Sequence, residues 1–317
     1  MIEILLKNKE IHKFQSIDEL SYSSLDFYVM QFLDYGDSEI NWLEKNYGLD
    51  FSIMKHYEDI EISSHFLESE NQAAFHFSLP FYNDDKKIIE EPIFIIISHA
   101  GLFLFSSTQL DTYLNKIYLN KFKPLRELED TTALLEFQFG FISDYFADVT
   151  ENLTRKIKAL ANTILIEKKF SNNEMDAITE YNFSNMLVKE LLIETTRVYR
   201  LYIKSNWEQK SGLKESIKAD LMDLTVVSDY IQFNFDRLDD LKENISNKID
   251  LEQNHIFKML TVATVCISLP TLIAGIYGMN FIEMPELETS YGYPITLLAM
   301  LLSAILPFIY FKRKNWL

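Results

Sequence analysis

Residues 259–282 read MLTVATVCISLPTLIAGIYGMNFI, and residues 289–311 read TSYGYPITLLAMLLSAILPFIYF. Neither stretch contains an acidic or basic residue. Each is long enough to cross the hydrocarbon core of a bilayer, which takes roughly 20 apolar residues. A helix hairpin buried in a soluble core is the alternative, but two such runs back to back are rare in cores. The two stretches therefore predict a pair of transmembrane helices.

The charges that flank the two spans predict their orientation. The connection, residues 283–288, carries three glutamates and no basic residue. Basic residues stand at the other ends of the spans, namely Lys258 before the first span and Lys312, Arg313 and Lys314 in the tail 312–317. Because basic flanks stay in the cytoplasm, we expect both termini on the cytoplasmic side and the connection outside. The membrane is expected to be an inner or plasma membrane.

Long helices are expected ahead of the membrane. No glycine or proline occurs between Gly212 and Pro270, so residues 212–258 predict a cytoplasmic stalk helix that continues into the first span. That uninterrupted helix would measure on the order of 85 Å. Residues 126–211 predict two helices antiparallel to the stalk, with a break at Ser171-Asn172-Asn173.

The first 125 residues predict a mixed α/β cytoplasmic domain. Residues 74–81 and 92–105 are typical of strands, with a turn at His99-Ala100-Gly101, whereas residues 17–33 and 110–119 show the apolar spacing of helices. Lys7, Lys9 and Glu10 interrupt the start before any apolar stretch long enough for a signal peptide, so this domain should stay where it is made. The predicted fold is an α+β membrane protein.

Composition excludes several classes of function. The formal net charge of −17 argues against nucleic-acid binding, which needs clustered Lys and Arg, and suits attraction of cations or simply a solvated acidic surface. Cys266 is the single cysteine, so neither a disulfide framework nor a cysteine metal cage can form within one chain. The six histidines lack ligand spacing, and no phosphate loop or nucleophile elbow is present. We do not expect an enzyme.

The end of the first span carries the strongest motif. Tyr277-Gly278-Met279-Asn280 is followed by Met284-Pro285-Glu286-Leu287, and the tail reads Lys312-Arg313-Lys314-Asn315-Trp316-Leu317. In these three features the chain resembles the CorA family of magnesium transport proteins. The resemblance is specific over residues 254–317 and rests on the order of elements elsewhere. It implies Mg²⁺ as both the transported and the regulatory ion.

The motif residues suit a hydrated cation. Because Mg²⁺ sheds water reluctantly, a selective pore can bind the hydrated ion through neutral oxygens that accept hydrogen bonds from its water shell. A ring of Asn280 side chains would supply such oxygens, so we expect the selectivity filter at Gly278, Met279 and Asn280. The alternative is that Gly278 and Asn280 merely end a helix.

Small and hydroxyl-bearing residues recur at three- and four-residue intervals along the first span. A stripe of this kind can line a water-filled path or serve as a packing face between helices, and both can hold in a symmetric bundle. The expected pore-lining residues are Thr264, Ser268, Thr271 and Gly275. Further along the same side, Phe257 and Leu260 would form a hydrophobic gate that closes by dewetting.

One lining helix cannot enclose a pore, so a homo-oligomer is required. The family resemblance implies five copies, and it implies gating by Mg²⁺ held between neighbouring cytoplasmic domains. The matching regulatory candidates are Asp220 and Asp223 on the stalk and Asp84 or Asp85 in a facing loop. A solvated acidic helix face is the alternative.

The sequence therefore predicts a channel that passes hydrated Mg²⁺ into the cytoplasm, with the lipid bilayer, divalent cations and its own copies as partners. A transporter of zinc, cobalt or nickel on the same scaffold is one alternative, against which Met279 weighs because related zinc carriers often replace it. A membrane-anchored sensor or scaffold is the other.

Overall fold

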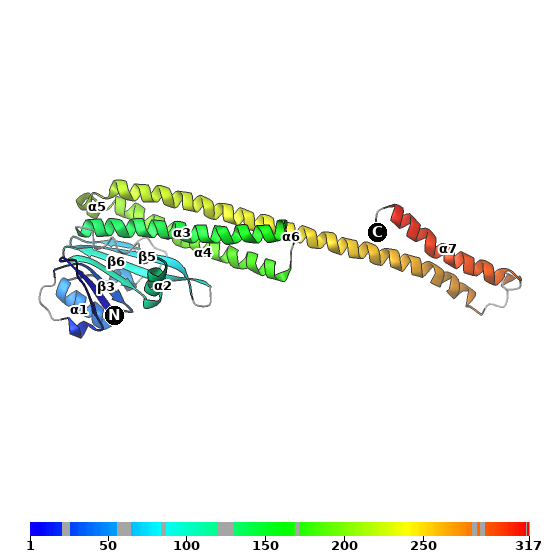
Figure 1. The fold of residues 1–317 in the computed structure, drawn as a ribbon, viewed down its shortest axis with the longest axis horizontal. Coiled ribbons are helices and arrows are strands. Elements are labelled where there is room, and N and C mark those ends of the chain that lie inside the picture. The colour runs from blue at the N-terminus through cyan, green and yellow to red at the C-terminus, as the bar shows by residue number, and fades with distance from the viewer. Residues whose placement is uncertain are drawn as a thin grey trace. The chain divides into compact units, whose positions relative to one another are not determined.

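The structure is a computed structural model that describes residues 1–20, 26–55, 65–83, 87–118, 130–168, 171–280, 284–285, 289–314 and 316. Its internal contacts divide the chain into two compact units, Met1–Asp239 and Asp240–Leu317. The first unit combines a β-sheet with helices (Figure 1), and the second is helical throughout its described elements.

The described strands of the first unit form one mixed sheet, ordered β2-β1-β3-β7-β6-β5-β4. All neighbours are antiparallel except β3 and β7, which run parallel. The strands are β1 (Ile2–Leu6), β2 (Ile11–Phe14), β3 (Phe27–Leu33), β4 (Phe66–Glu68), β5 (Gln72–Tyr82), β6 (Ile88–Ser98) and β7 (Gly101–Ser106).

The sheet is buried on both faces. Successive side chains of a strand point to opposite sides, so each strand contributes to two cores. Phe75 and Phe77 of β5 pack edge-on against Phe139 of helix α3 (Thr131–Leu165). On the other face, Ala74 belongs to the core that includes Leu43 of helix α1 (Asp37–Tyr47). A strand covered on both sides reads as a continuous apolar run, as residues 93–97 of β6 do.

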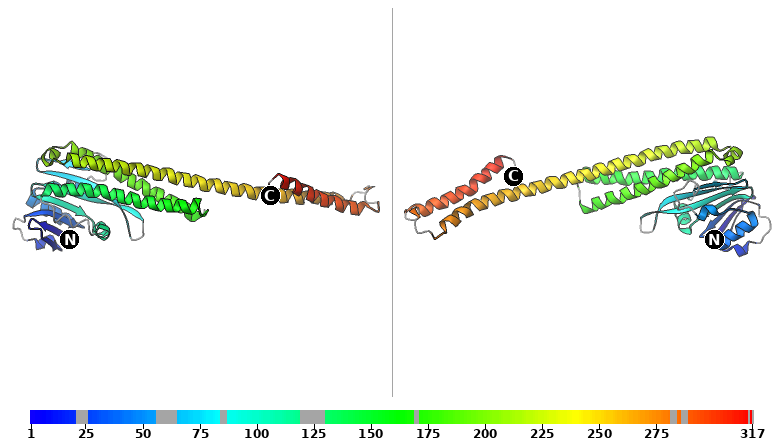
Figure 2. Two further views of the ribbon diagram at one scale, coloured as in Figure 1. Left: turned by 45° about the horizontal axis from the view of Figure 1, so that its top comes forward. Right: turned by 180° about the vertical axis from the view of Figure 1, so that it is seen from behind.

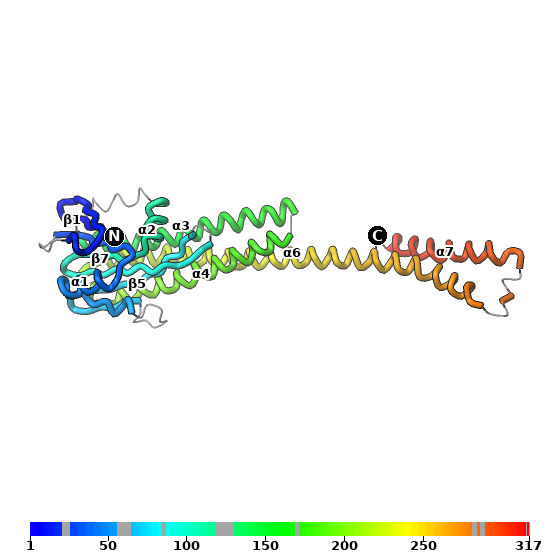
Figure 3. Tube along the Cα trace, turned by 90° about the horizontal axis from the view of Figure 1, so that it is seen from below, coloured from blue at the N-terminus to red at the C-terminus, as the bar shows by residue number. Residues whose placement is uncertain are grey.

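The helices of the first unit begin and end at recognisable caps. Asp130 accepts a hydrogen bond from the Ala133 amide at the start of α3, and Ser171 forms a capping box with Glu174 at the start of α4 (Asn172–Ile203). The predicted break at Ser171-Asn172-Asn173 is therefore confirmed. Short helices complete the unit: α2 (Thr108–Tyr118), α5 (Asn206–Ser211), and the 3₁₀ turns Ile17–Glu19 and Ser52–Lys55. Figure 3 shows α3 and α4 alongside the first part of helix α6.

Two predictions for the first 125 residues are confirmed and one is wrong. The turn at His99-Ala100-Gly101 does join two strands, β6 and β7, and α2 lies where a helix was expected. The helix expected over residues 17–33 is wrong for the described part of that range, which holds a 3₁₀ turn at Ile17–Glu19 and β3 at Phe27–Leu33, between β1 and β7. Its apolar residues fit a helical period, but burial on both faces of a central strand also favours an unbroken apolar run.

Helix α6 runs unbroken from Lys214 to Tyr277 and crosses from the first unit into the second. Pro270 lies within it without ending it. Helix α7 covers Gly292–Arg313, so it begins three residues later than the predicted span. Both helices contain a stretch long and apolar enough to cross a membrane, as expected.

In the second unit, the end of α6 and α7 lie side by side with opposite directions (Figure 2). The covered residues of α6 recur at helical spacing and are Val262, Val265, Cys266, Pro270, Ile273 and Tyr277. Those of α7 recur likewise and are Gly292, Thr296, Met300, Ser303, Ala304, Pro307 and Phe311. We infer that these two faces form the seam between the helices. Lys258 lies over the Trp316 ring at 6.0 Å, so the basic flank of the apolar stretch in α6 meets the tail that follows α7.

A pair of histidines is buried in the sheet of the first unit. The Nδ1 atoms of His65 and His76 lie 3.0 Å apart, and the His76 ring also stacks on Phe94. Since one nitrogen must donate and the other accept, at least one of the two rings is neutral in this contact. Burial, and secondarily the neighbouring His65, lowers the pKa of His76 to about 3.

This pair predicts that acid destabilises the fold. A pKa that is lower in the folded chain than in the unfolded chain means that the unfolded state gains protons first. Stability should therefore fall as the pH drops below about 6.5, by up to about 1.4 kcal/mol per pH unit for His76. Urea unfolding at several pH values between about 6.5 and 5 measures this slope.

His76→Phe should flatten the slope by close to one proton, because phenylalanine keeps the stack on Phe94 but cannot titrate. His12→Gln, on exposed strand β2, is the matched control and should leave the slope as in the wild type. An unchanged slope in His76→Phe would contradict the assignment.

Candidate functional site

The signature segment lies where α6 ends. The amide of Gly278 donates to the Ala274 carbonyl at 2.9 Å, and the amide of Met279 donates to Ile276 at 3.2 Å. A Cβ atom added at Gly278 would lie 3.0 Å from the Ala274 oxygen, so a glycine suits this tight last turn. Gly278, Met279 and Asn280 are all exposed in the single chain. The helix-end alternative thus explains Gly278, and the exposure of Asn280 is compatible with both the helix-end alternative and the predicted filter.

The hydroxyl stripe on α6 has its donors satisfied inside the helix. Thr264 Oγ1 donates to the Leu260 carbonyl at 2.8 Å, and Thr271 Oγ1 donates to the Ile267 carbonyl at 2.7 Å. Ser268 Oγ donates to Val265 at 3.4 Å. Each oxygen is left with lone pairs, so the stripe presents acceptors to whatever faces it. Acceptors are what the water shell of a cation requires, because those waters donate.

Three of the four predicted pore-lining residues, together with Met279 of the predicted filter, line one shallow hollow of about 660 Å³ on α6. Its lining consists of Ile267, Ser268, Thr271, Leu272, Gly275, Ile276 and Met279. Thr264 is exposed on the same helix but does not line the hollow. The structure thus brings Ser268, Thr271, Gly275 and Met279 together along one face.

This face differs from the seam with α7. The seam residues of α6 include Val265, Cys266 and Ile273, whereas Ser268, Thr271 and Gly275 are exposed. Within one chain, therefore, the small residues do not serve as the packing face between α6 and α7. They remain available to a water-filled path or to another copy.

The two predicted gate residues lie just before this stripe. Phe257 is 63% exposed and Leu260 is 60% exposed in the single chain, although both are large and apolar. Their carbonyls accept the hydroxyls of Thr261 and Thr264, so the apolar and hydroxyl-bearing parts of the helix adjoin directly. Their role as a gate stays a prediction.

The regulatory candidates lie in the first unit, on the other end of α6. Asp220 lies near Asp223 of its own helix and near two acidic residues of α3, Asp144 and Glu136. Burial, then the charges of Asp223, Asp144 and Glu136, raise the pKa of Asp220 to about 6. Among the described residues, Asp220 Oδ2 is buried and has no hydrogen-bond partner. Such an uncompensated carboxylate favours a cation beside it.

Sequence reasoning missed Asp144 and Glu136. Both lie on the helix that pairs with the stalk, and Ser143 Oγ donates to the Asp220 carbonyl at 3.4 Å, which fixes the register of the two helices. The signal that could have found them is that Glu136 and Asp144 are the only charged residues between Thr131 and Ala147, at a spacing of eight that falls within one broad helix face.

The loop candidates Asp84 and Asp85 lie outside the described residues. The chain enters the loop at the end of β5, where the Asn83 amide donates to the Lys87 carbonyl at 3.0 Å. Within the described ranges, no group of three or more His, Cys, Asp or Glu side chains is arranged to hold a metal ion. A metal site at Asp220 thus needs ligands beyond those of this part of one chain.

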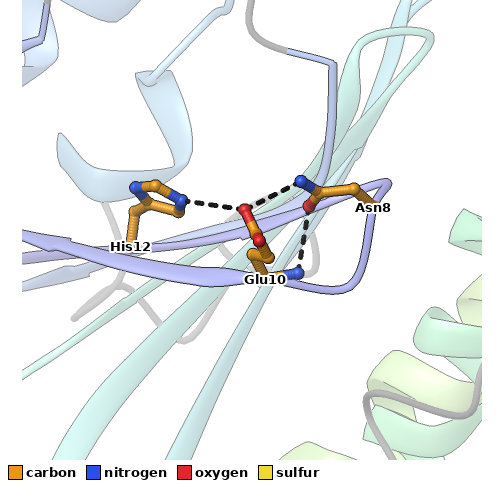
Figure 4. Close-up of polar contacts among 3 residues, drawn as sticks. All are labelled: Asn8, Glu10 and His12. Atoms are coloured by element: carbon orange, nitrogen blue, oxygen red, sulfur yellow. Dashed lines mark hydrogen bonds and ion pairs between the residues drawn. The ribbon is translucent and has the colours of Figure 1, made fainter.

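A further polar cluster, at the turn between β1 and β2, has a structural role. Asn8 Nδ2 donates to Glu10 Oε2 at 2.9 Å, and the Glu10 amide donates back to Asn8 Oδ1 at 3.0 Å (Figure 4). His12 Nε2 lies 3.5 Å from the same carboxylate. These contacts close the exposed turn and offer at most two metal ligands, too few for a site.

Comparison with known proteins identifies the family. A family model described as CorA-like Mg²⁺ transporter protein matches residues 25–313. The magnesium transport protein CorA of Campylobacter jejuni strain RM1221 is 30% identical over 88% of this chain and 88% of its own length. That of Wolinella succinogenes is 26% identical over 100% of both.

The fold agrees with a solved member. The complete structure of the CorA magnesium transporter from Methanocaldococcus jannaschii matches with a TM-score of 0.80 at 19% identity, and it covers 100% of this chain and 99% of that chain. The predicted fold class, with an N-terminal α/β domain, a long helix and two C-terminal apolar helices, is thereby confirmed. This chain belongs to the CorA-like family of Mg²⁺ transporters, which are membrane proteins.

Proposed function

We propose that this chain forms a homo-oligomeric channel that passes hydrated Mg²⁺ into the cytoplasm and closes when Mg²⁺ binds its first unit. The exposed, acceptor-bearing face of α6 that leads to Gly278, Met279 and Asn280 carries this proposal. Several copies of that face, arranged around one axis, would enclose a polar passage. By its resemblance to the family, the number of copies is five.

The filter works by accepting hydrogen bonds. A ring of Asn280 amide oxygens would bind the inner water shell of Mg²⁺, which the ion keeps. Neutral oxygens hold the ion less tightly than carboxylates would, so the ion can leave on the other side. Gly278 allows the tight last turn that precedes Asn280, because a Cβ atom there would lie 3.0 Å from the Ala274 oxygen.

The passage continues along the hydroxyl stripe. The hydroxyls of Thr264, Ser268 and Thr271 donate to carbonyls of their own helix. Toward the water shell of a passing ion they therefore act only as acceptors. With both termini in the cytoplasm, as the basic ends at Lys258 and Arg313 favour, a divalent ion gains about 4.6 kcal/mol per 100 mV on moving inward. The membrane potential can therefore drive uptake.

The gate lies at Phe257 and Leu260. Both are exposed in one chain, and apolar side chains of this size are stabilised when other copies cover them. Rings of the two residues would exclude water when they approach, which interrupts the path of a hydrated ion.

Cytoplasmic Mg²⁺ would hold the gate closed through the acidic cluster. Asp220 and Asp223, with Asp144 and Glu136 beside them, supply charge, and Asp84 or Asp85 of a neighbouring copy would supply further ligands. When the ion leaves, the carboxylates repel one another across the interface, which loosens the ring and separates the gate residues.

Removal of the filter amide tests conduction. Asn280→Ala should reduce Mg²⁺ uptake into proteoliposomes by about tenfold or more, because each copy loses one amide oxygen that accepts a hydrogen bond from the water shell of Mg²⁺. Asn247→Ala, exposed on α6 outside the apolar stretch, is the matched control and should conduct like the wild type. Equal uptake by Asn280→Ala would refute the filter, and no uptake by the wild type would indicate a tether instead.

Neutralisation of the acidic cluster tests regulation. The pKa of Asp220 is higher in the folded chain than in the unfolded chain, so without Mg²⁺ its charge lowers stability above about pH 6. Asp220→Asn should raise the free energy of unfolding at neutral pH by roughly 1 kcal/mol, a figure reduced for partial solvent exposure.

Neutralisation of both aspartates should remove the protection that Mg²⁺ gives against proteolysis. Mg²⁺ should slow trypsin cleavage of the wild type but not of the double variant Asp220→Asn, Asp223→Asn, since the ion then lacks its ligands. Asp229→Asn, exposed on the same helix, should keep the protection. Full Mg²⁺ protection of the double variant would show that the regulatory site lies elsewhere.

A further inference from the structure

A groove between α4 and α6 in the first unit is not used by ion conduction or by the acidic cluster. It has a volume of about 660 Å³, within the range of small-molecule sites. Ten residues line it: Leu192, Ile193, Thr196, Arg197, Arg200, Leu201 and Lys204 of α4, and Leu224, Thr225 and Ser228 of α6.

The groove is basic although the chain is acidic. Arg197, Arg200 and Lys204 stand three and four residues apart at the end of α4, so their side chains emerge on one face. No acidic residue is among the lining residues, in a chain whose net charge is −17. Arg197 also interacts with the neighbouring Glu194, whose pKa is raised to about 7 by burial and by the nearby carboxylates Glu90 and Glu190.

The remaining lining residues divide into hydroxyls and an apolar floor. Thr196 and Ser228 bring hydroxyl groups from opposite walls, whereas Thr225 donates to its own helix at the Leu221 carbonyl. Leu192, Leu201 and Leu224 form the floor, of which Leu192 and Leu224 are 2% and 1% exposed. Basic residues near a helix C-terminus stabilise the helix dipole by themselves, but the dipole explains neither the hydroxyls nor the floor contributed by α6.

We propose that this groove binds a small polyphosphate anion, in particular a nucleoside triphosphate. The guanidinium groups of Arg197 and Arg200 match phosphate oxygens in forked geometry, and Lys204 adds a point charge. Thr196 and Ser228 donate to the remaining oxygens. The base lies on the apolar floor of Leu192, Leu201 and Leu224. This binding requires neither the pore nor the Mg²⁺ site.

Binding to the full-length protein in detergent tests the assignment. Fluorescently labelled ATP is titrated at a fixed free Mg²⁺ concentration, so that chelation cannot alter occupancy of the acidic cluster, and unlabelled ATP, tripolyphosphate and inorganic phosphate compete. ATP should compete best, tripolyphosphate less well and inorganic phosphate least. Arg197→Gln combined with Arg200→Gln should weaken ATP binding by about tenfold or more, since charge-assisted hydrogen bonds are lost.

Two variants separate the groove from general charge effects. Arg237→Gln removes one cation elsewhere on α6 and should bind ATP like the wild type. Leu201→Gln should weaken ATP but leave tripolyphosphate unchanged, because only the base uses the floor. The groove variants should keep the thermal unfolding midpoint without ligand, which shows that they fold.

Three results would overturn the proposal. Absence of ATP and tripolyphosphate binding at about 1 mM would remove the site altogether. Equal binding by the Arg197 and Arg200 double variant would place the ligand elsewhere. A change in oligomer size of that variant without ligand would show that the groove receives a second copy of the chain instead.

Discussion

In hydrocarbon, every hydrogen-bond donor needs an acceptor within the protein, and this constraint shapes the two apolar helices of the fold. It makes a continuous helix the form in which α6 can enter the membrane, because a helix satisfies its own amides. The hydroxyls of Thr264 and Thr271 meet this requirement by donating to carbonyls of the preceding turn, a bond that Thr225 also makes in the first unit. A surface of oxygen acceptors remains. In the proposed pore, the same satisfied hydroxyls would offer their free lone pairs to a cation whose water shell supplies the donors.

The sequence predicted the helical half of the fold well because its signals are local. An absence of charge over residues 259–282, the capping residues at Ser171 and the stretch without glycine or proline before Pro270 each determine the backbone within a few residues. The strand β3 was predicted as a helix because the strand that pairs with it is distant in the sequence. Its partner β7 lies some seventy residues later in the chain, and only that pairing shows that both of its faces are buried.

The candidate site shows the same division. The residues from Phe257 to Asn280 lie on one helix, so periodicity alone could place Thr271 and Gly275 on one face. The acidic cluster required the register between α3 and α6, which depends on packing across many turns. Asp220 could be chosen by resemblance, but Asp144 and Glu136 emerged only when the helices were placed side by side.

The seam between α6 and α7 carries one more consequence. Cys266 is the single thiol of the chain, and it lies on the covered side of α6 rather than on the hydroxyl stripe. Its rate of alkylation by a membrane-permeant maleimide therefore reports how far the two helices separate. The native protein carries its own reporter for movement within the helical pair, and no engineered label is needed.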